Sequence, residues 1–182
     1  MTILWHQRKD RVIRMPIGMK FGIWRTIKLG TCKTPDEYRT ALKKVHYRIG
    51  DWSNNALGKT PCAQEETEVD LVLLSVKELA FGSGAYYKDI CAKAFELGLE
   101  LCPAEVGPAL RLAYKDQPRG EWLRVAMEAI TDSDGDPRVF AAVYDSGKLW
   151  LDADDGYPEM FWDADDRVVF LRPRKPALTA VA

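Results

Sequence analysis

An acidic and aromatic segment near the carboxyl end is the most unusual part of the sequence. The tetrapeptide Asp-Ala-Asp-Asp occurs twice in it, at 152–155 and at 163–166, among tryptophan, tyrosine and phenylalanine residues. Ring faces and carboxylates both attract positive charge, so this composition is typical of a cage for an organic cation or a basic peptide. The candidate ligand-binding residues are Trp150, Asp152, Asp154, Tyr157, Trp162 and Asp163.

Two other interpretations of this segment stay open. The rings could stack on a sugar while the carboxylates accept its hydroxyl hydrogens. Alternatively, the rings belong to the hydrophobic core and the acids form the solvated rim of a long loop. The cation cage and the sugar site require accessible rings, whereas the last interpretation requires buried rings.

Residue spacing argues against a metal site. The chain has four cysteines, at positions 32, 62, 91 and 102, with no pair at zinc-ribbon spacing, and only two histidines. Asp132, Asp134 and Asp136 match the first ligand positions of an EF-hand loop. Pro137 and Val143 stand where that loop needs glycine and glutamate. We therefore expect reduced thiols, no metal and no cofactor.

Charge is divided unevenly along the chain. Residues 1–60 hold 13 Lys and Arg against 4 Asp and Glu, whereas residues 61–182 hold 13 against 23. We expect these two regions to lie against each other, so that their opposite charges stabilise the fold. Within residues 131–166, 11 acids accompany only Arg138 and Lys148. Such a surface repels phosphate backbones and attracts cations.

The function that this pattern favours is a non-catalytic binding module for a cationic small molecule or a basic protein. A small hydrolase or transferase with a carboxylate pair at the same rim is one alternative. A winged-helix nucleic-acid-binding protein, with helices at 86–97 and 103–113, is another. Against it, Gly107-Pro108 is expected to break the second helix, and the hairpin that follows is acidic. A homo-oligomer is compatible with the sequence.

These residues must be positioned by a mixture of helices and strands. Thr34-Pro35 predicts the start of a helix that ends near Gly50, and 86–97 predicts a helix that ends before Gly98. A short helical turn is expected at 51–57. Alternation of apolar and polar residues predicts strands at 21–29, 110–114 and 123–127, and turn residues introduce further strands at 139–144 and 148–151. A last strand is expected at 167–171, after an irregular acidic loop. The apolar run 69–76 is interpreted as a buried strand, with the start of a helix through Phe81 as the alternative.

The predicted fold class is α+β. Short turns between the later strands predict a C-terminal antiparallel meander, which could curl into a partial barrel, packed by two to three N-terminal and central helices. We expect an N-terminal appendage at 1–18, a single domain at 19–175 and a frayed tail at 176–182. The longest apolar run, at 139–144, has six residues, against about 20 for a membrane span, so a soluble cytoplasmic protein is expected.

Four stretches of the chain carry a resemblance to known sequences, and they are Leu97–Pro108, Tyr114–Pro118, Gly120–Leu123 and Thr131–Gly135. They resemble a group of short bacterial hypothetical proteins, of the kind encoded on mobile gene cassettes or in environmental DNA. The similarity runs from Met19 to about Lys175. It implies no activity, cofactor or catalytic residue.

Overall fold

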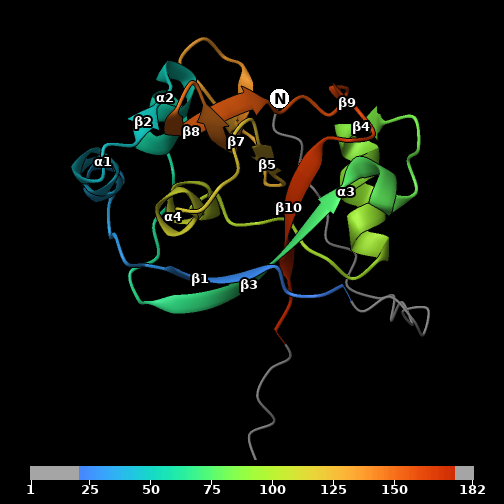
Figure 1. The fold of residues 1–182 in the computed structure, drawn as a ribbon, viewed down its shortest axis with the longest axis horizontal. Helices are drawn as coiled ribbons and strands as arrows, with labels where there is room; N and C mark the ends of the chain where they lie inside the picture. The colour runs from blue at the N-terminus through green and yellow to red at the C-terminus, as the bar shows by residue number, and fades with distance from the viewer. Residues whose placement is uncertain (1–20, 175–182) are drawn as a thin grey trace, which may run out of the picture.

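An eight-stranded mixed β-sheet, curled into a half-barrel, is the framework of residues 21–174, the part of the chain that the computed structural model describes (Figure 1). The strand order is β1-β3-β10-β5-β7-β8-β2, with β6 beside β7. The strands are β1 (Arg25–Leu29), β2 (Arg48–Ile49), β3 (Thr67–Ser75), β5 (Trp122–Val125), β6 (Ile130–Thr131), β7 (Pro137–Asp145), β8 (Lys148–Asp155) and β10 (Arg167–Arg172).

Four α-helices and a 3-10 turn pack on this sheet within the described residues. They are α1 (Pro35–Lys44), α2 (Asp51–Gly58), η1 (Val76–Leu79), α3 (Tyr87–Glu96) and α4 (Val106–Ala113). A separate two-stranded sheet joins β4 (Ala85–Tyr86) to β9 (Phe161–Trp162). The predicted α+β class is confirmed.

Helix α4 lies in the concavity of the half-barrel. It contacts β1 and β8, which stand near opposite ends of the strand order, so the sheet must curl around it. In Figure 1 α4 and α3 lie on opposite sides of β10. The hydrophobic core therefore fills the space between the inner face of the sheet and α4, and extends beneath α3.

The predicted antiparallel meander is confirmed for β5, β7 and β8 but is extended by strands that pair in parallel. Strand β10 joins β5 in parallel, and β2 joins β8 in parallel. Parallel partners come from distant parts of the chain, because a crossover connection must separate them. Local alternation of residues gives no signal for such pairs.

Helix α1 begins as predicted and ends earlier than expected. The Thr34 side chain accepts a hydrogen bond from the Glu37 N–H and caps the helix, and Pro35 occupies its first position. The helix stops at Lys44 because His46 adopts a left-handed backbone conformation with φ of 62°. The chain then enters β2 rather than continuing as a helix to Gly50.

The strand predicted at 110–114 is wrong, since this segment is the second half of α4. Gly107 and Pro108 do not break the helix because they lie in its first turn, where a missing N–H removes no intrahelical bond. Six of the eight residues of α4 are buried. This burial leaves α4 no free face for a nucleic-acid groove, as the winged-helix alternative would require.

Strand β8 is four residues longer than predicted and continues through Asp155. Leu151 and Ala153 are buried and alternate with partly exposed aspartates, so the period of two persists into the segment expected to be an irregular loop.

No helix in residues 21–174 is long and apolar enough to span a membrane. All four cysteines are free, in agreement with the expected reduced thiols. The appendage predicted at 1–18 and the tail predicted at 176–182 lie outside the described residues.

Candidate functional site

Three of the predicted site residues lie on one face of β8, and these are Trp150, Asp152 and Asp154. Ala153 is paired with Phe140, whose side chain packs against Gly107 of α4 and so marks the inner face of the sheet. Because side chains alternate along a strand, the three residues face outward. All three are partly exposed.

Two aspartates of the first Asp-Ala-Asp-Asp copy protect the free edge of β8. Asp152 accepts a hydrogen bond from the Ala153 N–H, and Asp154 accepts one from the Asp155 N–H, both at 2.9 Å. The short strand β2 pairs with β8 only as far as Leu151, so these N–H groups lie beyond its reach. An open row of N–H groups recruits foreign strands, and the carboxylates occupy it.

The predicted pairing of an aromatic ring with carboxylates around a cation does exist at Trp162, and the cation is internal. The Arg124 guanidinium lies 5.2 Å from the ring centroid of Trp162. It also forms ion pairs with Asp154 at 2.6 Å and with Asp166 at 2.8 Å. The ring and carboxylates of this cage are therefore occupied by the protein's own arginine.

Trp162 is only 1% exposed. The prediction of an accessible ring at this position is therefore wrong, and Trp162 is a core residue. Its other neighbour is Tyr87, with ring centroids 4.4 Å apart. The sequence did not show whether the Trp162 ring is accessible or buried. Trp162 is on β9, and the partner strand β4 precedes α3 and lies far away in the chain.

The second Asp-Ala-Asp-Asp copy forms a turn. The Asp163 N–H donates to the Asp166 carboxylate at 2.9 Å, and the Asp166 N–H donates to the Asp163 carbonyl at 3.0 Å. The carboxylate of Asp163 is exposed to solvent. The two copies thus have the same sequence and different structures, a strand edge and a turn.

Tyr157, the remaining predicted residue, belongs to a second cation cage. Its hydroxyl donates to Asp136, and Asp136 forms an ion pair with Arg138 at 3.3 Å. Arg138 also pairs with Asp132, at 2.8 Å, and with Asp155. Its guanidinium carbon lies 4.0 Å from the ring centroid of Trp52 on α2. We call this group the Arg138 cluster, and its members are Trp52, Asp132, Asp136, Arg138, Asp155 and Tyr157.

The spacing of acids that resembled a calcium loop has a structural role here. Asp132 accepts hydrogen bonds from the N–H groups of Asp134 and Asp136, at 2.9 and 3.0 Å, and so closes the turn that precedes β7. Its second oxygen pairs with Arg138. No group of three or more His, Cys, Asp or Glu side chains in residues 21–174 is arranged to hold a metal ion.

The charges in the Arg138 cluster shift the pKa values of its members. The hydrogen bond from Arg138 lowers the pKa of Asp132, helped by the two backbone N–H groups and opposed by desolvation. Burial lowers the pKa of Arg138, but the hydrogen bond to Asp132 and the nearby aspartates outweigh it and raise the pKa. The hydrogen bond to Asp136 raises the pKa of Tyr157. The tyrosine therefore remains a hydrogen-bond donor at neutral pH.

The Arg138 cluster differs from the Arg124 cage because much of it remains exposed. Trp52 is 52% exposed and Tyr157 is 41% exposed, although each has a polar partner in the cluster. The side chains of Asp136 and Asp155 are 42% and 39% exposed. The Arg138 cluster thus presents two rings and two carboxylates to solvent, whereas Trp162 beside Arg124 is sealed.

Carboxylates also outnumber cations at this surface. Three aspartates of the cluster share the single charge of Arg138, and the exposed Asp134 adds a fourth acid. The neighbouring cation is Lys59, which donates to the Thr131 carbonyl at 2.7 Å. Counting both cations against the four acids, the surface keeps a net charge of −2.

A buried carboxylate outside these clusters, Glu105, is fully used by the fold. It accepts hydrogen bonds from the Gly30 N–H, the Tyr38 hydroxyl and the Ala63 N–H, at 2.8, 2.7 and 2.7 Å. Burial and this hydrogen bond raise the pKa of Tyr38 far above its usual value. Glu105 therefore joins the loops around α1 to the start of α4.

Arg124, Arg138 and Trp52 belong to the cages but were not among the residues predicted from the sequence. Arg138 carried a usable signal, because a lone arginine among many aspartates is expected to be their counter-ion. Arg124 lies outside the acidic segment, and Trp52 precedes Arg138 by 86 residues. No local pattern connects these residues to the segment. Comparisons with protein-family models, curated proteins and solved structures found no match to the chain.

Proposed function

We propose that the protein is a non-catalytic binding module that takes a cationic ligand, a basic peptide in particular, at the exposed part of the Arg138 cluster. The observation that supports this most directly is the position of Arg138 itself. Its guanidinium lies against the ring of Trp52 and is surrounded by carboxylates, which is the arrangement that an external basic side chain would need.

The surface has capacity left for such a ligand. More than half of Trp52 is exposed, so a second guanidinium can stack on the part of the ring that Arg138 does not cover. Asp134 and Asp136 supply carboxylates within the same loop, and the net negative charge favours the approach of cations. Exposed cation–π contacts are worth about 0.5–1 kcal/mol each, so we expect binding to need several basic side chains.

Binding is tested with a capped tetra-arginine peptide, followed by isothermal titration calorimetry at low and at moderate ionic strength. Wild-type protein should bind tetra-arginine more tightly than tetra-lysine, because the planar guanidinium stacks on an indole ring. Tetra-glutamate should not bind. Increasing salt should weaken binding, because the surface charges are screened.

The variants Trp52→Ala and Asp134→Asn should each lower the affinity for tetra-arginine by about fivefold. The matched control is Trp122→Ala, which removes another tryptophan of 40% exposure on β5. It should keep the affinity within about twofold. Equal affinity of all three variants would contradict the proposal. Turnover of a glycoside or ester substrate that Asp136→Asn abolishes would instead favour the hydrolase alternative.

A further inference from the structure

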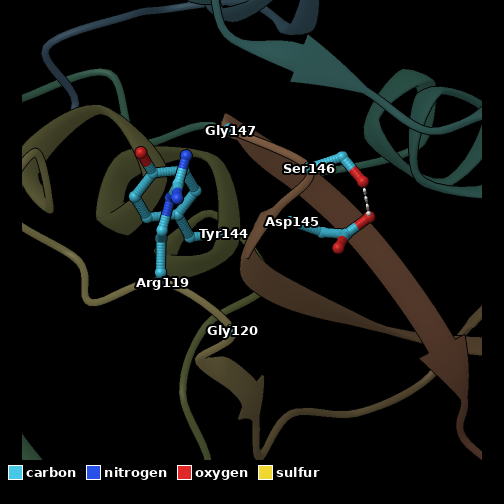
Figure 2. A pocket seen from close by; sticks show the side chains of 6 residues that line it. All are labelled: Arg119, Gly120, Tyr144, Asp145, Ser146 and Gly147. Carbon is cyan, nitrogen blue, oxygen red and sulfur yellow. Dashed lines mark hydrogen bonds between the residues drawn. The ribbon is translucent and has the colours of Figure 1, made fainter.

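A basic hollow lies at the opposite end of the β7–β8 hairpin from the Arg138 cluster. It has a volume of about 420 Å³ and is formed by the 45–48 segment, Lys115 after α4, and the hairpin turn. A smaller hollow of about 320 Å³ adjoins it, and the two share Tyr144 and Gly147. Figure 2 shows the smaller one, with Arg119 and Tyr144 on one side.

The cations around these hollows have no counter-ions in the described part of the chain. Arg48, Lys115 and Lys148 line the larger hollow, and Arg119 lines the smaller one. None of the four forms an ion pair with a carboxylate of residues 21–174. The single acid of the lining is Asp145. In Figure 2 it bonds to Ser146 across the hollow from Arg119.

A further positive charge lies behind the wall of the larger hollow. Arg111 is completely buried, and its guanidinium lies 5.3 Å from the ring centroid of Tyr47, which lines the hollow. Its hydrogen-bond acceptors are neutral, namely the Gln117 side chain and the Tyr114 and Val143 carbonyls. Burial lowers the pKa of Arg111 to about 10, so it remains charged at neutral pH.

The backbone around the hollows is held in conformations that side chains rarely adopt. Of the three non-glycine residues with positive φ in the described part of the chain, two line these hollows, His46 at 62° and Ser146 at 49°. His46 follows the end of α1, and Ser146 forms with Gly147, at 75°, the two-residue turn of the β7–β8 hairpin. Both turns direct the chain around the same opening, which lies between the 45–48 segment and the hairpin turn.

We propose that the joined hollows bind a small anionic molecule that carries phosphate groups beside an aromatic ring. Unpaired Arg48, Lys115, Arg119 and Lys148 would neutralise the phosphates, and the field of Arg111 adds to theirs. Tyr47 and Tyr144 line the larger hollow, and the aromatic ring of the ligand would pack against them there. A small molecule fits better than a nucleic acid, because the cations converge on a concavity and do not follow an extended track.

The experiment measures the affinity of the full chain for ATP by isothermal titration calorimetry, with inorganic pyrophosphate and adenosine as partial ligands. ATP should bind most tightly, pyrophosphate more weakly, and adenosine weakest, if phosphates dominate and the ring contributes. Lys115→Gln and Lys148→Gln should each lower the affinity for ATP by about fivefold or more. Lys88→Gln, which removes the same charge from an exposed position of α3, should change it less than about twofold.

Three results would overturn the proposal. The first is the absence of ATP and pyrophosphate binding to wild-type protein. The second is equal ATP affinity for Lys148→Gln and Lys88→Gln, with melting temperatures confirming that both variants are folded. The third is tighter binding of a mixed-sequence DNA duplex than of ATP, lost in the same variants, which would assign the basic residues to a nucleic-acid surface.

Discussion

Arg124 and Arg138 are surrounded by the same kinds of side chain, a tryptophan ring and two or more aspartates. A buried or half-buried guanidinium needs such partners because desolvation of the charge is costly. Arg124 pairs with Asp154 and Asp166, and the Trp162 ring beside it is buried. The acids outnumber the cation at both arginines, but only at Arg138 do two rings and two carboxylates remain exposed. This exposure distinguishes a surface that can accept a ligand from one that only stabilises the fold.

Replacing Arg138 should destabilise the protein in a pH-dependent way. Arg138→Gln leaves Asp132 nearly inaccessible to solvent without its cation, so we expect the melting temperature at neutral pH to fall by roughly 5–10 °C. The control is Lys77→Gln, which breaks the exposed ion pair to Asp165 and should have little effect. Differential scanning calorimetry of both variants checks this expectation.

The sign of the pH dependence follows from the lowered pKa of Asp132. A carboxyl group whose pKa is depressed by folding contributes stability above its unfolded pKa, here 3.8, and loses it as the pH falls through the folded value. The difference in melting temperature between wild type and Arg138→Gln should therefore be largest near neutral pH and shrink below about pH 4. A difference that stays constant into acid would show that Asp132 is not the partner that matters.

The four thiols should react slowly in the folded protein. Burial raises the pKa of Cys62 to about 11 and of Cys91 to about 12, and it also raises those of Cys32 and Cys102. Since the thiolate is the reactive form, Ellman's reagent at about pH 8 should modify Cys91 and Cys102 only after unfolding. Mass spectrometry of the modified peptides in native and denaturing buffer measures the order. Rapid native modification of Cys102 would contradict the burial described above.

At the scale of elements, the close packing of α4 against β7 depends on one glycine. A Cβ atom placed on Gly107 would lie 2.5 Å from ring carbons of Phe140, too close for either backbone or ring to accept without moving. We expect Gly107→Ala to lower the free energy of unfolding by about 1–3 kcal/mol, although alanine is the better helix former. Urea denaturation measures the change.

The matched control for this prediction is Gly82→Ala. A Cβ atom at Gly82 would meet nothing within 4 Å, so the same substitution should leave the free energy of unfolding nearly unchanged. If both variants were equally stable, the helix would not be packed against Phe140 as closely as the structure has it.

Elements with strong local signals were predicted correctly, and the pairing of distant strands was not. The cap at Thr34 and the glycine at Gly98 delimit α1 and α3 through bonds within a few residues. Helix α4 was mistaken for a strand because apolar and polar residues alternate by chance in its second half, and its eight residues are too few for the helical period to stand out. Strand β2 fell within a predicted helix and pairs with β8 about 100 residues later, whereas β10 was predicted as a strand but its parallel pairing with β5 was not.

The candidate site was predictable in chemistry more than in position. Carboxylates and rings do meet around a guanidinium, as the composition of the acidic segment indicated. The cation, however, came from within the chain. The sheet brings Arg124 to its cage and α2 brings Trp52 to the other, and neither position could be predicted without the fold. Tyr157 is the one predicted residue that belongs to the exposed Arg138 cluster.

At the scale of the whole molecule, the β7–β8 hairpin separates two surfaces of opposite charge. Lys148 lies at its turn beside the basic hollow, and Asp155 lies at its other end in the Arg138 cluster. The seven residue steps from Lys148 to Asp155 span about 23 Å of extended chain, almost three times the Debye length of about 8 Å at physiological salt. The two surfaces should therefore bind their ligands independently.

This independence can be measured by exchanging variants and ligands. Trp52→Ala should bind ATP with wild-type affinity, and Lys148→Gln should bind tetra-arginine with wild-type affinity, each within about twofold. Calorimetric titration of each pair provides the values. A loss of both affinities in either variant would mean that the two surfaces act as one site or that the variant disturbs the fold.

The most direct test of the Arg138 cluster as a binding surface uses the indole N–H signals of the six tryptophans in a nuclear magnetic resonance titration with tetra-arginine. The signal of Trp52, assigned by its loss in Trp52→Phe, should shift progressively and saturate, while those of Trp122, Trp150 and Trp162 stay in place. A Trp52 signal that does not move while another of these signals shifts would contradict the account.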